Sequence, residues 1–214
     1  EAFKPNAVEL ADGPLGKLGM KGTDTEARDA RPMAYLNRLR GLNARKIVGF
    51  KMFPEHANRV KALKEHVLRN PKWLKVFLRR NPVASYASLL RAHQTGVWTL
   101  RTTAPASRRN GLDARVTFTA ESFDKHMQVA TWFDTLCADL AGIADNRCLP
   151  LAYDAVADRS ALPGLLSFIG SAAPAETLTS EYERQFEGTL AEGFANWDAL
   201  VAHAQAHGHG AALA

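Results

Sequence analysis

The stretch KVFLRRNPVASYASLL, from Lys75 to Leu90, joins a short apolar run to a helix start. The apolar run Val76, Phe77 and Leu78 predicts a buried strand. Asn81 is a favoured N-cap residue and Pro82 suits the first helical position, so a helix is expected from Asn81 to about Thr95. Two arginines, 79 and 80, therefore stand where the strand ends and the helix begins.

The flanking residues extend this pattern to a strand–helix–strand unit. Residues 45–53 (RKIVGFKMF) predict a second buried strand, and residues 147–153 (RCLPLAY) predict a third. Between the first two strands, apolar side chains recur at helical spacing: Val60, Leu63, Val67 and Leu68. Such a unit implies parallel pairing through a right-handed crossover, so the predicted fold class is α/β.

Other segments complete the expected secondary structure. Helices are predicted at 33–42, 118–142, 161–170 and, around Gly188 and Gly193, 176–205. Residues 1–30 and 101–115 have the composition of loops. The tail 207–214 is predicted to be frayed.

Size and composition limit the possible classes of protein. A chain of 214 residues is expected to form one domain, 1–214, and its net charge of +5 favours an anionic partner. Its two cysteines are too few for a disulfide scaffold, so a reducing, cytoplasmic compartment is expected. No apolar run approaches about 18 residues, so no membrane span is expected.

The two arginines lie where α/β proteins bind ligands, outside the carboxyl end of a strand. The guanidinium groups of Arg79 and Arg80, the backbone donors of the following helix and its dipole favour an anion there, most naturally a phosphate. The Ser88 hydroxyl, two turns into the helix, would reach that ligand. The alternative is that the arginines pair with nearby acids and that the small residues only pack the helix.

The same residues resemble a known motif. RNPVASYAS, from Arg80 to Ser88, is similar to the 3′-phosphate-binding motif of sulfotransferases that use 3′-phosphoadenosine 5′-phosphosulfate (PAPS). VGFKMF (48–53), RAHQTGVW (91–98) and ERQ (183–185) follow the order found in bacterial carbohydrate sulfotransferases. The resemblance implies a three-layer α/β/α, P-loop-NTPase-like fold with a central parallel sheet. It also implies that Arg79, Arg80, Ser88 and Arg184 bind PAPS. For Arg184, an ion pair with Glu181 is the plain alternative.

The resemblance departs from the family at the N-terminus. The family opens with a strand and a phosphosulfate-binding loop, whereas this sequence starts at EAF, similar to a family segment that lies after that loop. The expectation is an N-terminally truncated form of the fold, with the loop upstream of residue 1.

The resemblance also suggests candidates for catalysis of sulfuryl transfer. Glu1 matches the family's general base, and His56, just past the predicted strand 45–53, is the alternative base. Lys51 would stabilise the bridging oxygen of the leaving group, unless it is only a solvated strand-end lysine. Trp98 would stack on a base or a sugar, unless it only packs in the core.

Several alternatives remain beside a PAPS-dependent enzyme with a carbohydrate or glycolipid acceptor. They are a P-loop-type nucleotide or sugar kinase and an inactive sulfotransferase-like fragment. A nucleic-acid-binding module is less favoured, because the basic residues are spread along the chain. A homodimer is possible in the family. No metal site is expected, because His203, His207 and His209 fall in or near the tail predicted to fray.

Overall fold

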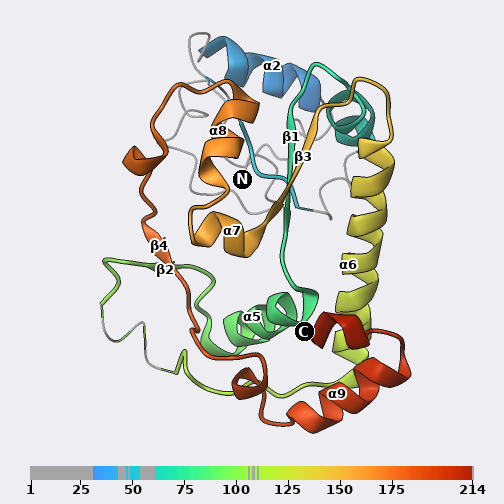
Figure 1. Cartoon of the computed structure of the whole chain (residues 1–214), viewed down its shortest axis with the longest axis vertical. Helices are drawn as coiled ribbons and strands as arrows, with labels where there is room; N and C mark the ends of the chain where they lie inside the picture. The colour runs from blue at the N-terminus through green and yellow to red at the C-terminus, as the bar shows by residue number, and fades with distance from the viewer. Residues whose placement is uncertain are drawn as a thin grey trace. The chain divides into compact units, whose positions relative to one another are not determined.

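The computed structural model describes residues 31–42, 47, 49–53, 61–105, 107, 109 and 111–213 (Figure 1). Over these residues the chain is a mixture of helices and strands with a small parallel sheet, compatible with the α/β class. The elements are, in chain order, α2 (Pro32–Leu42), α4 (Lys61–Leu63), the π-helical turn η3 (Lys64–Leu68), β1 (Lys75–Arg79), α5 (Pro82–Thr95), β2 (Leu100–Arg101), α6 (Ala120–Ala141), β3 (Cys148–Ala152), α7 (Tyr153–Ala157), α8 (Leu162–Ile169), η5 (Ala175–Thr177), β4 (Tyr182–Glu183), η6 (Ala191–Gly193), α9 (Trp197–Ala206) and η7 (Gly210–Leu213).

The parallel sheet of the described chain consists of β1 and β3, which run side by side (Figure 1). The main-chain nitrogen of Lys75 donates to the carbonyl oxygen of Arg147, 3.0 Å away. β1 buries only one face, because successive strand residues point to opposite sides. Lys75 and Phe77 are buried, whereas Val76 and Leu78 are exposed. The prediction of a strand is therefore confirmed, but the prediction that its whole apolar run is buried is wrong.

The strand predicted at 45–53 is not formed by the described residues 47 and 49–53, which belong to no regular element. Ile47 is exposed, and Phe50 packs edge-on against Trp73 with 6.1 Å between ring centroids. The apolar pattern predicted a buried strand, but it could not predict which strand this segment would pair with. Among the described residues β1 pairs with β3, far along the chain, and residues 47 and 49–53 form no strand, so they do not form the predicted strand–helix–strand unit.

Helix α5 forms where its sequence signals place it. Asn81 Oδ1 accepts hydrogen bonds from the backbone nitrogens of Val83 (2.9 Å) and Ala84 (3.1 Å), which satisfies two donors of the first turn. Pro82 needs no hydrogen-bond acceptor as the first helical residue. Gly96 ends the helix in the left-handed conformation, with φ of 70°.

The C-terminal quarter of the chain differs from its prediction. Of the helix expected at 176–205, only the last part forms, as α9, and the preceding residues form short 3₁₀ turns, loops and the strand β4. The tail expected to fray is instead ordered as far as Leu213. Its Ala212 and Leu213 pack on a buried cluster, and Asn81 Nδ2 donates to the Ala212 carbonyl oxygen at 2.9 Å.

The chain divides into two compact units, each made of separate stretches. Unit 1 comprises Glu1–Phe77, Thr135–Leu149 and Leu165–Ala172, and unit 2 comprises Leu78–Asp134, Pro150–Gly164 and Ala173–Ala214. The expectation of a single domain over 1–214 stays a prediction.

Unit 1 contains a buried lysine. Lys75 is 4% exposed, and its ammonium group donates to Asn146 Oδ1 and to the carbonyl oxygen of Asn70. Asn146 Nδ2 donates in turn to the carbonyl oxygens of Leu140 (2.7 Å) and Leu68 (3.2 Å). One amide side chain thus joins the strand β1, the end of η3 and the end of α6.

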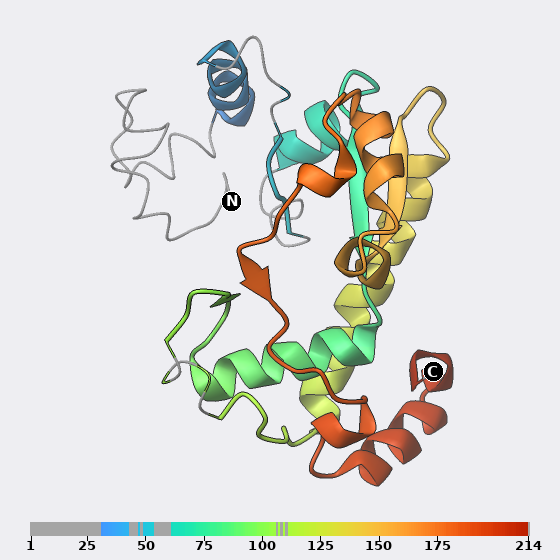
Figure 2. The same cartoon turned by 60° about the vertical axis from the view of Figure 1, so that its left-hand side comes forward.

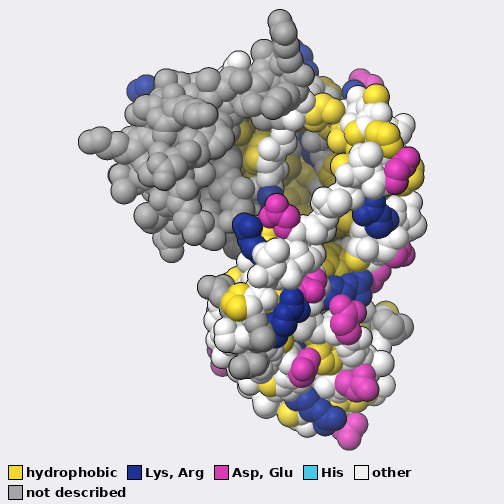
Figure 3. Space-filling view, turned by 90° about the vertical axis from the view of Figure 1, so that its left-hand side faces the viewer, with side chains coloured by type: hydrophobic (Ala, Val, Ile, Leu, Met, Phe, Trp, Pro, Cys, Tyr) yellow, Lys and Arg dark blue, Asp and Glu magenta, His cyan; other side chains and the backbone are white. Residues whose placement is uncertain are grey.

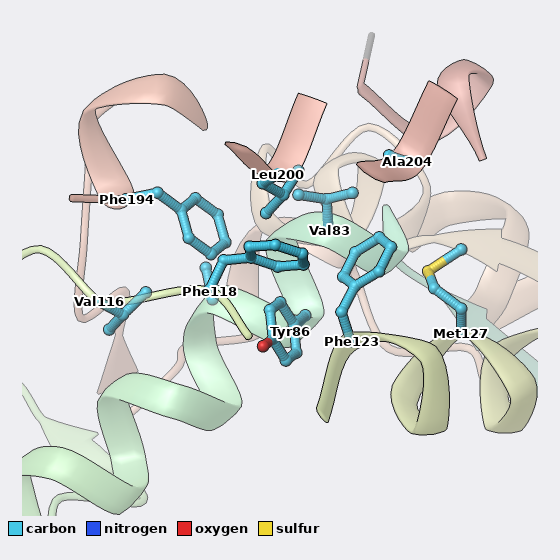
Figure 4. Packing of buried hydrophobic residues seen from close by; sticks show 10 residues of the cluster. Val83, Tyr86, Val116, Phe118, Phe123, Met127, Phe194, Leu200 and Ala204 are labelled. Carbon is cyan, nitrogen blue, oxygen red and sulfur yellow. The ribbon is translucent and has the colours of Figure 1, made fainter. Parts of the chain in front are cut away.

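Unit 2 contains an aromatic core (Figure 4). Its buried members come from α5, α6, α9 and the loops before α6 and α9: Val83, Tyr86, Ala87, Val116, Phe118, Phe123, Met127, Phe194, Leu200 and Ala204. Tyr86 and Phe123 meet edge to face at 5.4 Å. Figure 2 shows α5, the first half of α6 and α9 close together, and the core is formed by buried side chains of these helices and the loops beside them.

Candidate functional site

Arg80 stands between the end of β1 and the N-cap of α5. Its guanidinium group lies over the ring of Tyr153, 4.5 Å from the ring centroid. Tyr153 is the first residue of α7 and directly follows β3. Because β1 and β3 are parallel neighbours, their carboxyl ends lie at the same edge of the sheet, and the residues that follow them can meet there.

Arg184 reaches the same ring from the loop after β4. Its guanidinium carbon is 5.6 Å from the Tyr153 centroid, and its Nη2 is 2.7 Å from Oδ1 of Asp154. The alternative pairing of Arg184 with Glu181 is wrong, since Glu181 pairs with Arg101 at 3.2 Å. Two of the arginines that the resemblance assigns to PAPS binding therefore lie on one tyrosine. We call Arg80 and Arg184 the arginine pair.

The electrostatics of the arginine pair favour an added anion. Burial by surrounding atoms lowers the pKa of Arg80, the hydroxyl of Tyr153 and the carboxylate of Asp154 raise it, and the charge of Arg184 lowers it. Arginine nevertheless stays charged in proteins. Two guanidinium groups with one carboxylate beside them leave a net positive charge at a partly desolvated place, which an anion such as phosphate would offset.

The other predicted PAPS ligands are Arg79 and Ser88. Arg79 is turned to α6, where its Nη2 is 2.7 Å from Oδ1 of Asp134 in an exposed ion pair. Ser88 is half-buried on α5, about 9 Å along the helix axis from Pro82. The roles of Arg79 and Ser88 in PAPS binding stay predictions.

The predicted catalytic residues do not lie in the described part of unit 2. Lys51 belongs to unit 1, is exposed, and holds its ammonium nitrogen 4.4 Å from the centroid of the Phe53 ring. Glu1 and His56 lie outside the described residues. The choice between them as the general base stays open.

Sequence reasoning missed Arg91, on the same helix as Ser88. Arg91 is 2% exposed, and its guanidinium group stacks over Phe186 at 4.3 Å. Its Nε and Nη2 have no hydrogen-bond acceptor among the described residues. Arg91 follows Ser88 by three residues, so the two side chains lie on one face of the helix. This spacing is the signal by which the sequence could have pointed to Arg91. Nothing in the sequence shows that this face is covered.

Gly188 allows Phe186 to cover Arg91, and its replacement by alanine is expected to destabilise unit 2 by about 1–3 kcal/mol. A Cβ atom at Gly188 would lie 2.5 Å from Cζ and 2.8 Å from Cε1 of Phe186, so the ring has to move. Urea denaturation of the variant measures the effect. Gly164→Ala is the control, because a Cβ there meets no atom within 4 Å. Equal losses of stability in Gly188→Ala and Gly164→Ala would contradict the close approach of the Phe186 ring to Gly188.

Three further findings concern the described residues. Within them, no group of three or more His, Cys, Asp or Glu side chains is arranged to hold a metal ion, and His203 pairs with Asp124 at 2.7 Å. None of their helices is both long and apolar enough to cross a membrane. Over the described part of the face in Figure 3, basic and acidic side chains are interspersed, unlike the continuous basic patch of a nucleic-acid-binding surface.

Comparisons with protein-family models, with curated proteins and with solved structures found no match. The resemblance of residues 80–88 to a sulfotransferase motif thus stays a prediction. The geometry around Arg80 is the basis for assigning a function.

Proposed function

We propose that this chain is a sulfotransferase of the bacterial carbohydrate type, with a P-loop-NTPase-like α/β/α fold. It transfers a sulfuryl group from PAPS to a hydroxyl group of a carbohydrate or glycolipid acceptor. The meeting of Arg80 and Arg184 on the Tyr153 ring carries the proposal. In the proposed complex these two guanidinium groups bind the 3′-phosphate of PAPS, and the Ser88 hydroxyl donates a further hydrogen bond.

The reaction proposed is an in-line displacement at sulfur. The acceptor oxygen forms the new S–O bond while a general base, Glu1 or His56, takes its proton. The bond between sulfur and the bridging oxygen breaks, and its electron pair stays with the 5′-phosphate. Cations that stabilise this growing charge, Lys51 among them, supply catalysis together with the positioning of the cofactor by the arginine pair.

Exposed aromatic side chains of unit 2 support a carbohydrate acceptor. Trp98 is 60% exposed and meets His93 edge-on at 5.0 Å, and Tyr182 on β4 is also exposed. An exposed aromatic ring offers an apolar face together with a polar edge, which suits the mixed surface of a sugar. The exposure of Trp98 disfavours the reading that it only packs in the core.

Thermal unfolding with adenosine 3′,5′-bisphosphate or 5′-AMP, at matched ionic strength, tests the proposal. At 100 times its dissociation constant, the bisphosphate is expected to stabilise the fold by about 2.7 kcal/mol, and 5′-AMP by much less. Arg80→Ala should abolish the difference, because it removes a cation from the 3′-phosphate. Arg147→Ala, at an exposed arginine of unit 1, controls for the loss of net charge.

Three results would count against an active sulfotransferase. Equal stabilisation by both nucleotides would favour the kinase relative, which has no use for a 3′-phosphate. No stabilisation by the bisphosphate would contradict PAPS binding by this chain. Stabilisation without any sulfuryl transfer to sugars would instead identify an inactive binding protein.

A further inference from the structure

Arg91 carries a buried positive charge, and two hydrogen-bond donors of its guanidinium group have no acceptor among the described residues. The face of its guanidinium group is covered by Phe186, and the backbone of Gly193 lies against it, since a Cβ there would be 3.5 Å from Nη2. At the edge of the group, Nε and Nη2 lack acceptors among the described residues. Buried donors of a cation that have no acceptor cost free energy, and an anion at this edge would supply the missing acceptors.

The position of Arg91 relates it to the arginine pair. Ala84, Ser88 and Arg91 share one face of α5, because they are spaced by four and three residues. Arg80 precedes this row by four residues, just before the helix. Side chains on a helix lean toward its N-terminus, so the side chain of Arg91 leans back along the row toward Ser88.

The charges that act on Arg91 agree with this arrangement. Burial lowers the pKa of Arg91 most, and the positive charge of Arg80 lowers it further. The carboxylate of Asp113 acts in the opposite direction. An anion bound by both arginines would offset this repulsion between their charges.

We propose that Arg91 is a third anion-binding residue of the site formed by the arginine pair, and that it makes the site select phosphate monoesters with two negative charges. The inference rests on the proposed function, because it places the 3′-phosphate of PAPS between Arg80 and Arg91. Nε and Nη2 of Arg91 then donate to phosphate oxygens. A singly charged phosphodiester offers less charge to three guanidinium groups and is bound more weakly.

Calorimetric titration at pH 8 with inorganic phosphate, 3′-AMP and 2′,3′-cyclic AMP tests this selectivity. The parent chain is expected to bind 3′-AMP, a doubly charged monoester, more tightly than the singly charged cyclic ester. Arg91→Met should weaken 3′-AMP and phosphate binding about 10- to 100-fold, because hydrogen bonds between charged groups are lost. Arg147→Met, which removes the same charge from an exposed place in unit 1, should leave both affinities unchanged.

A second measurement guards against a purely structural role for Arg91. Without ligand, Arg91→Met should melt at a higher temperature than the parent, because an unpaired buried charge has been replaced by an apolar side chain. A variant that melts lower or does not fold would overturn the inference, since Arg91 would then be paired within the protein. Unchanged binding of 3′-AMP by folded Arg91→Met would overturn it as well.

The outcomes also separate this inference from the proposed function. Phosphate and 3′-AMP binding that depends on Arg91, without any response to adenosine 3′,5′-bisphosphate, would support Arg91 and contradict the sulfotransferase. Bisphosphate binding that depends on Arg80 but not on Arg91 would support the sulfotransferase and contradict the inference for Arg91. A parent chain that binds neither phosphate nor 3′-AMP would overturn the inference.

Discussion

Replacing Asn146 with leucine is expected to lower the free energy of unfolding by about 3–5 kcal/mol, the range found when a buried charge loses its partner. The Lys75 ammonium group donates to Asn146 Oδ1 and is 4% exposed, so water cannot replace the lost acceptor. The carbonyl oxygens of Leu68 and Leu140 lose their amide donor at the same time. Urea denaturation at pH 7 measures the loss.

The pH dependence of this loss identifies its cause. Burial lowers the pKa of Lys75 below its ordinary value of 10.5. Between the lowered pKa and 10.5 the unfolded chain binds more protons than the folded chain, so the contribution of Lys75 to the free energy of unfolding rises with pH. A neutral amine needs its acceptor less than an ammonium ion does. The gap between the parent and Asn146→Leu should therefore narrow as the pH approaches 10.5.

A double variant controls for simple loss of packing. Lys75→Met with Asn146→Leu removes the charge as well as its acceptor, and it should recover part of the stability that Asn146→Leu loses. A double variant less stable than the single one, or a gap that does not change with pH, would contradict the role given to the buried ammonium group.

Replacing Phe123 with alanine is expected to lower the free energy of unfolding by about 3–5 kcal/mol, the usual range for deleting a buried aromatic ring. Phe123 has no exposed surface and meets both Tyr86 (5.4 Å) and Phe118 (5.6 Å) edge-on (Figure 4). These neighbours come from a different helix and a loop, so the cavity cannot close by a shift of α6 alone.

The same helix offers a matched control for Phe123→Ala. Val129 is exposed, and Val129→Ala should change the free energy of unfolding by no more than about 0.5 kcal/mol. Urea denaturation of both variants gives the comparison. A loss below about 1.5 kcal/mol for Phe123→Ala would mean that the aromatic cluster repacks around the missing ring.

Local signals in the sequence were enough to predict α5. Asn81 and Pro82 specify a helix start by chemistry confined to one turn, and the structure forms the expected cap. Local signals also predicted α6, α8 and β3, because their apolar patterns are long or sharply bounded. These predictions succeeded because the residues that decide them are neighbours in the chain.

The predictions that were wrong concern features that depend on residues far apart in the sequence. Residues 47 and 49–53 are apolar enough for a strand but belong to no regular element, and the described partner of β1 is β3. Residues 178–196 have helical spacing, yet Gly188 and Phe186 adopt a loop that packs on Arg91. For the site, sequence and resemblance named Arg80 and Arg184 but not Tyr153, where they meet. The burial of Arg91 is decided by a loop about 100 residues away, beyond the reach of any local pattern.

The core of unit 2 has a consequence for synthesis on the ribosome. Phe123 is translated well before Leu200 and Ala204, which cover the same cluster. At roughly 5–20 residues per second, the stretch between Phe123 and Leu200 takes about 4–15 seconds to make. During that interval the nascent chain presents an uncovered aromatic surface, which is the kind of surface that chaperones bind. Chaperone occupancy should therefore fall once α9 has left the exit tunnel.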